Sequence, residues 1–69
     1  MMKAIIVNGV NLVPEKFYVL DIFSGPVCGP FDTESAAEND RRQINIAEDC
    51  VVGICEQRQN GKVGFRPCQ

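Results

Sequence analysis

The sequence of 69 residues contains no histidine. Histidine is the usual base that activates a catalytic cysteine or serine, so its absence argues against nucleophilic catalysis. Asp21 and Glu56 could in principle form an acid–base pair, but a chain this short rarely builds the desolvated cleft that such a pair needs. The six glycines form no phosphate-binding loop and suit turns or bulges instead. We therefore expect a protein that is not an enzyme and needs no cofactor.

No stretch approaches the roughly 18 apolar residues that a membrane-spanning helix requires. The apolar run near the start, Ala4 to Val7, is too short for a secretory signal peptide and is followed by no cleavage-site pattern. Asn-x-Ser/Thr glycosylation acceptors are also lacking. These features predict a cytoplasmic protein.

Basic charge is scarce, and the formal net charge is −2. Binding to nucleic acid or to anionic membranes usually needs a basic surface, so neither is expected. The charge is nevertheless uneven along the chain. From Asp32 to Asp49 acidic residues outnumber basic ones six to two, whereas all charges after Glu56 are positive. Such segregation either steers a partner or simply reflects solvated faces.

The chain has four cysteines, at positions 28, 50, 55 and 68. Zinc sites usually contain cysteine pairs two to four residues apart, and this sequence has no such pair. Cys50 and Cys55 lie in a predicted strand, where a five-residue spacing directs them to opposite faces. Without an export signal, reduced and mostly buried thiols are expected. A disulfide in one of three possible pairings is the alternative, and no metal is expected. The four residues are Cys28, Cys50, Cys55 and Cys68.

The length predicts a single domain spanning residues 1–69. A chain of this size buries only about 60% of the surface that its unfolded form exposes, so the core is thin. Small domains of this kind often add a covalent staple or a second subunit. A homodimer is therefore among the expected states.

Turn signals divide the chain into short strands. Asn8-Gly9 predicts a type I′ turn that joins strands 4–7 and 10–13 into a hairpin. Residues 16–23, rich in aromatic and β-branched side chains, form the strongest strand. After Ser24-Gly25 the chain returns as strand 26–31, whose prolines suit a sheet edge.

A helix is predicted over residues 33–45. Asp32 or Thr33 can cap its start, and Glu34 favours the first turn because of the helix dipole. Strand 50–57 follows, and Asn60-Gly61 predicts a second type I′ turn before strand 62–66. The fold class is therefore α+β: an antiparallel sheet of about four to six short strands, with one helix packed on one face.

The strongest strand is apolar on both faces. Tyr18, Leu20 and Ile22 alternate with a second apolar set, and a strand of this kind needs cover on both sides. One short helix covers only one face, so the other is expected to bind a partner or a second copy of the chain. The alternative is that the N-terminal hairpin closes it. The second set, proposed as a partner-binding sheet face, is Phe17, Val19 and Phe23.

From Phe17 to Gln57 the chain resembles small proteins of phages and prophages. The motif is a strand, a Gly-Pro-Phe-Asp-Thr segment and a capped helix with an Ala-Glu pair and an arginine. The segment also resembles the second half of a SPOR-type peptidoglycan-binding repeat, whose first strand–helix half has no counterpart here. The matching residues are Tyr18-Val19-Leu20-Asp21, Ser24-Gly25-Pro26-Val27, Gly29-Pro30-Phe31-Asp32-Thr33, Ala37-Glu38, Arg41 and Val51-Val52.

The phage resemblance implies a stoichiometric inhibitor that binds and blocks a host enzyme or defence complex, as anti-CRISPR proteins do. Such a protein would act in the host cytoplasm. Its partner would be reached through the sheet face or through acidic residues of the helix, which could compete for a basic groove. The helix residues are Glu34, Glu38 and Asp40.

The alternative function is a nucleic-acid-binding accessory protein that uses the basic C-terminal hairpin. Aromatic side chains among basic residues can stack on the bases of a single strand. One aromatic and three cations make a small site, and the net negative charge favours the protein-binding hypothesis. The residues of this alternative are Arg58, Lys62, Phe65 and Arg66.

Overall fold

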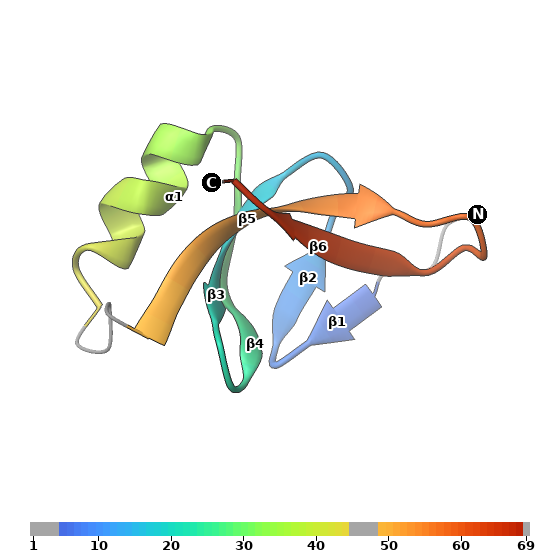
Figure 1. Ribbon diagram of the computed structural model, residues 1–69, viewed down its shortest axis with the longest axis horizontal. Helices are drawn as coiled ribbons and strands as arrows, with labels where there is room; N and C mark the ends of the chain where they lie inside the picture. The colour runs from blue at the N-terminus through green and yellow to red at the C-terminus, as the bar shows by residue number, and fades with distance from the viewer. Residues whose placement is uncertain (1–4, 45–48, 69) are drawn as a thin grey trace.

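The computed structural model describes residues 5–44 and 49–68 and has the predicted α+β fold. Two short strands form an N-terminal hairpin, and four strands form the main sheet in the order β4-β3-β5-β6. All strand pairs are antiparallel. The elements are β1 (Ile5–Val7), β2 (Val10–Leu12), β3 (Phe17–Asp21), β4 (Gly25–Phe31), α1 (Glu34–Arg41), β5 (Cys50–Gln57) and β6 (Val63–Pro67), as drawn in Figure 1.

The first hairpin turns as its sequence predicted. Asn8 and Gly9 have φ angles of 55° and 77°, and Val7 pairs with Val10 directly across the turn. Two successive residues with positive φ define a type I′ turn, whose twist matches that of the flanking strands. Ala4, the predicted start of this hairpin, lies outside the described residues.

The second hairpin differs from its prediction. Gly61 has a φ of 74°, but Asn60 is not among the residues with positive φ, so Asn60-Gly61 is not a type I′ turn. The Arg58 amide donates to the Lys62 carbonyl at 2.7 Å, and the Gly61 amide donates to the Arg58 carbonyl at 3.2 Å. The loop therefore has three residues, and only its last one needs the left-handed region.

Helix α1 is shorter than predicted. Thr33 is the N-cap, and its hydroxyl accepts a hydrogen bond from the Ala36 amide at 3.1 Å. The helix ends at Arg41, where the following amides bond three residues back and tighten the last turn: Ile44 donates to the Arg41 carbonyl at 3.2 Å. Residue 45, the predicted end, lies outside the described residues.

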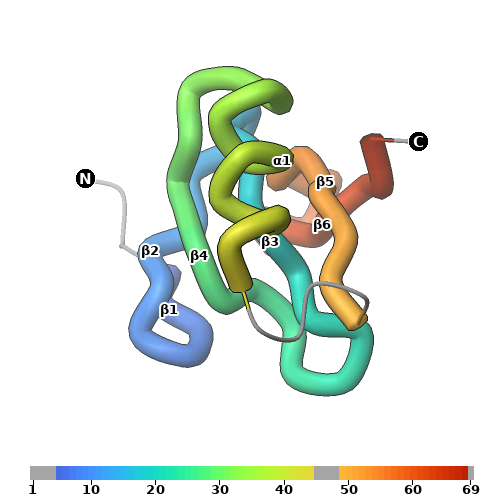
Figure 2. Tube along the Cα trace, turned by 90° about the vertical axis from the view of Figure 1, so that its left-hand side faces the viewer, coloured from blue at the N-terminus to red at the C-terminus, as the bar shows by residue number. Residues whose placement is uncertain are grey.

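The sheet is covered on both faces, with α1 on one side and the β1–β2 hairpin on the other (Figure 1). Figure 2 shows α1 in front of β3, between β4 and β5. The expectation that one face stays open is therefore wrong, and the hairpin closure that was its alternative is observed. The helix-side core contains Val19, Ala37, Cys50 and Val52. The hairpin-side core contains Val10, Leu12, Tyr18 and Cys55, with Val63 and Phe65 packed against it.

Tyr18 joins the hairpin to the sheet. Its side chain is fully buried, and its hydroxyl donates to the Asn11 carbonyl at 2.6 Å and accepts from the Val13 amide at 2.7 Å. Its ring also meets that of Phe65 edge to face, with centroids 5.4 Å apart. The two backbone bonds satisfy polar groups at the point where the chain leaves β2.

Candidate functional site

The three predicted acidic residues of the helix do not form one free patch. Glu38 is ion-paired to Arg41 at 2.6 Å and to Arg42 at 3.3 Å. The hydrogen bond from Arg41 is the main cause of a lowered Glu38 pKa. Asp40 lies beside the thiol of Cys28. Of the three, only Glu34, in the first turn, is an exposed residue.

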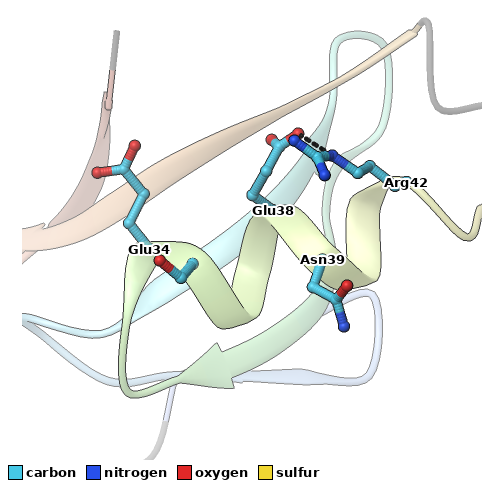
Figure 3. A pocket seen from close by; sticks show the side chains of 5 residues that line it. Glu34, Glu38, Asn39 and Arg42 are labelled. Carbon is cyan, nitrogen blue, oxygen red and sulfur yellow. Dashed lines mark hydrogen bonds and ion pairs between the residues drawn. The ribbon is translucent and has the colours of Figure 1, made fainter.

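The outer surface of α1 carries an open hollow of about 510 Å³. Figure 3 shows Glu38 turned towards Arg42, while Glu34 and Asn39 point away from that pair. The arginines neutralise the Glu38 carboxylate, so the hollow presents little net charge to a ligand. Its lining residues are Glu34, Ser35, Glu38, Asn39 and Arg42.

The structure separates the three residues predicted as a partner-binding sheet face. Val19 is fully buried beneath the helix, so no partner reaches it in this fold, and Phe17 is half-buried. Phe23 lies beyond the end of β3, in the turn to β4, with 82% of its surface exposed. Of these three side chains, only that of Phe23 is exposed to solvent.

The turn that carries Phe23 is held by Asp21. One oxygen of the Asp21 carboxylate accepts hydrogen bonds from the amides of Phe23 at 2.7 Å and Ser24 at 3.3 Å. The preceding amide, that of Ile22, donates to the Asp49 carbonyl at 3.0 Å. An aspartate that bonds amides two and three residues ahead stabilises a tight turn and ends the strand.

A second brace comes from the N-terminal hairpin. The Asn8 side-chain amide donates to the Ser24 carbonyl at 2.6 Å and to the Pro26 carbonyl at 3.3 Å. The tip of that hairpin therefore sits against the β3–β4 turn, as the lower part of Figure 1 shows. Asn8 was predicted only as a turn residue, and no local pattern signals a partner 16 residues away.

Other exposed apolar side chains lie near this turn. Val7 directly precedes Asn8, and Val51 pairs with Leu20, two residues before Ile22. We call Ile22 and Phe23 the turn knob, because both are exposed at the apex. Phe23 has the largest exposed fraction among the exposed large hydrophobic side chains of the described part of the chain.

The basic hairpin does not hold its residues as a stacking site requires. Phe65 packs against Tyr18 in the hairpin-side core, whereas the neighbouring Arg66 projects from the other face of β6. Glu56 lies 3.2 Å from Arg58 and 3.9 Å from Arg66. Lys62 is exposed in the loop. The cations are therefore exposed at the surface, whereas the Phe65 ring is partly buried against Tyr18.

All four cysteines are free thiols, and the two core clusters confirm that Cys50 and Cys55 face opposite sides of the sheet. Burial raises the pKa of all four thiols, and that of Cys28 reaches about 11, with Asp40 adding to the effect of burial. Raised pKa values make thiols poor nucleophiles at neutral pH. Within residues 5–44 and 49–68 no group of three potential metal ligands is present.

Stability is expected to fall as the pH rises above about 9. An unfolded thiol ionises near its ordinary pKa of 9.0, whereas folded Cys28 holds its proton until about 11. Between these values the folded state binds more protons, so each rise in pH favours unfolding. Ionisation of Cys28 alone is expected to lower the free energy of unfolding by roughly 1–2 kcal/mol over this pH range, after allowance for its partial exposure. Urea unfolding under reducing conditions between pH 9 and 11 measures the effect. The free energy of unfolding of Cys28→Ala should fall less steeply with pH than that of wild type. A wild-type free energy that does not change with pH would contradict the prediction.

The fold is a small α+β domain with two antiparallel sheets, and its described part contains no helix long and apolar enough to cross a membrane. Comparisons with protein-family models, with curated proteins and with solved structures found no match. Function is therefore inferred from the geometry of the chain itself.

Proposed function

We propose that this protein is a small, non-catalytic protein-binding module that anchors its partner through the turn knob. The observation that supports the proposal most directly is Phe23, a large apolar side chain that is 82% exposed on a turn braced from two sides. Residues that dominate protein interfaces are typically aromatic and are fully buried in a pocket of the partner.

The braced turn reduces the free-energy cost of binding. Ordering a flexible loop at an interface opposes association, and a loop already fixed in its bound shape avoids that loss. Asp21 fixes the backbone of the knob from β3, and Asn8 fixes it from the N-terminal hairpin. Burying a phenylalanine side chain in a partner is worth about 1.5–3 kcal/mol. A preformed turn retains most of that gain.

The proposal extends to the inhibitor function that the phage resemblance implies. A module that binds without catalysing a reaction acts stoichiometrically, by occupying a surface that its partner needs. The turn knob supplies the apolar anchor of such an interface, and the exposed Glu34 on the distant helix is available for a second, electrostatic contact. The inhibited partner would then be a host enzyme or a defence complex.

Replacing Phe23 with serine is expected to abolish partner capture without weakening the fold. Because Phe23 makes few contacts within the chain, the free energy of unfolding should change by less than about 0.5 kcal/mol. The measurement compares proteins retained by tagged, reduced wild type and by Phe23→Ser from a lysate of the organism that carries the gene. Loss of one stoichiometric protein with the variant supports the proposal.

Ile6→Ser is the matched control. Ile6 is also an exposed aliphatic side chain, at 63%, but it points away from the core side of β1 that Ile5 occupies. The control should retain the same partner as wild type. Equal retention by Phe23→Ser, or equal loss in both variants, would contradict the proposal. Sedimentation that gives twice the 7.6 kDa chain mass, lost only in Phe23→Ser, would identify a second copy as the partner.

A further inference from the structure

Strand β6 forms one edge of the main sheet. It pairs with β5 over Val63–Pro67, and no other strand of the described part pairs with its outer side. An edge strand exposes backbone groups that can pair with another chain. The orientation of those groups follows from the two hydrogen bonds that flank the strand.

The flanking bonds define which residues of β6 face outward. The Arg58 amide donates to the Lys62 carbonyl, and the Cys68 amide donates to the Val52 carbonyl at 3.1 Å. In an antiparallel pair, hydrogen-bonded positions alternate. The even-numbered residues of β6 therefore bond to β5, and Val63, Phe65 and Pro67 direct their backbone groups outward. Proline lacks an N–H group, and Pro67 occupies an outward position where β5 requires none.

The opposite edge of the sheet is closed to such pairing. Strand β4 contains Pro26 and Pro30, which carry no N–H group. The β1–β2 hairpin lies beside β4, and Asn8 already uses the Pro26 carbonyl. Strand β6, in contrast, directs the amides of Val63 and Phe65 outward, together with the carbonyls of Val63, Phe65 and Pro67. The sheet is thus extendable at β6 and not at β4.

The side chains along β6 indicate the charge of a matching strand. Gly64 leaves a gap in the strand, and the Arg58 guanidinium lies over it: a Cβ atom on Gly64 would be 2.8 Å from Nε and Nη2 of Arg58. Arg66 lies on the same face, and Glu56 is placed between the two arginines. Lys62 is exposed at the start of the strand. Glu34 lines the hollow beside Arg66, so three cations face two carboxylates, and the remaining positive charge favours an acidic partner.

The two faces of β6 differ in polarity. A strand added beside β6 would therefore match it best if its acidic and apolar side chains alternate. On the face of Gly64, beside the end of the strand, an open hollow of about 440 Å³ is lined by apolar Phe17 and Ile54 and by charged Glu34 and Arg66. On the other face Val63 and Phe65 pack against the hairpin-side core and offer apolar neighbours to an added strand. An added strand with an acidic residue level with Gly64 would bring its carboxylate to Arg58.

We propose that β6 binds an extended acidic segment of a partner protein as a fifth strand of the sheet. Backbone bonds to Val63 and Phe65 supply affinity, and the arginines on the Gly64 face select carboxylates. This surface is separate from the turn knob, which lies between β3 and β4, and Figure 1 shows the β3–β4 turn and the β5–β6 hairpin at different ends of the sheet. Binding of a strand at β6 therefore does not depend on the proposed function of the turn knob, and each can be tested without the other.

The test uses a fluorescent peptide of alternating Glu and Val, with an alternating Lys and Val peptide as its control. The full chain is expected to bind the acidic peptide at least about tenfold more tightly, with affinity that falls as salt rises. Amide signals of Val63 and Phe65 should shift on titration. Equal binding of both peptides, or shifts confined to other elements, would overturn the proposal.

Two variants locate the contact. Val63→Pro removes an outward amide and leaves the bonds to β5 intact, so it should abolish peptide binding while circular dichroism is unchanged. Arg58→Gln keeps the backbone edge and should weaken binding of the acidic peptide about tenfold, which tests the site even if Val63→Pro does not fold. Phe23→Ser should bind the peptide normally. Tighter binding of oligothymidylate than of peptide, or self-association through β6 that excludes the peptide, would count against the proposal.

Discussion

Replacing Gly29 with alanine is expected to destabilise the fold strongly. Gly29 has a φ of 135°, which residues with a side chain rarely adopt, and a Cβ atom there would overlap Cδ2 of Tyr18 and lie 2.8 Å from Cε2. The ring cannot retreat, because both its hydroxyl bonds and its contact with Phe65 fix it. The combined strain and overpacking should lower the free energy of unfolding by about 3 kcal/mol or more, measured by urea denaturation.

Gly61→Ala is the matched control for this prediction. Gly61 also has a positive φ, 74°, but a Cβ atom there would meet no described atom within 4 Å. The variant should therefore lose only the free energy of unfolding that corresponds to backbone strain, about 1 kcal/mol. Losses of equal size in the two variants would show that the contact with Tyr18 is not what requires glycine at position 29.

Local chemistry explains why most elements were predictable. Asn8-Gly9 forms the expected type I′ turn because both residues tolerate positive φ, and Thr33 caps the helix because its hydroxyl reaches the Ala36 amide. Strand Cys50–Gln57 matches its predicted bounds, and its regular alternation places Cys50 and Cys55 on opposite faces. Each of these outcomes depends on a few neighbouring residues.

Long-range packing explains what was missed. Nothing within residues 5–12 indicates that this hairpin lies on the second face of the sheet, where Tyr18 hydrogen-bonds its end. The predicted strand 16–23 extends past the observed end of β3 because the apolar pattern continues beyond Asp21. Only the bonds from the Asp21 carboxylate to the next amides show that the chain turns there.

The candidate sites show the same limitation for charge. The acidic helix was identified by counting carboxylates, but a count does not record that Arg41 and Arg42 both pair with Glu38. The basic hairpin was identified in the same way, and the burial of Phe65 against Tyr18 could not be read from its sequence. Composition located the charged segments correctly, whereas the partner of each side chain depends on the fold.

Replacing Tyr18 with phenylalanine is expected to loosen the N-terminal hairpin and lower the free energy of unfolding by about 1–3 kcal/mol. The variant keeps the ring but removes the hydroxyl, leaving the Val13 amide and the Asn11 carbonyl without their partner. The readout is urea denaturation together with hydrogen exchange at Val13, whose amide should lose protection. Phe65→Leu is the control: it removes the edge-to-face contact, worth about 0.5–1.5 kcal/mol, but keeps both hydroxyl bonds, so Val13 should stay protected. Unchanged exchange at Val13 in Tyr18→Phe would mean that apolar packing alone holds the hairpin on the sheet.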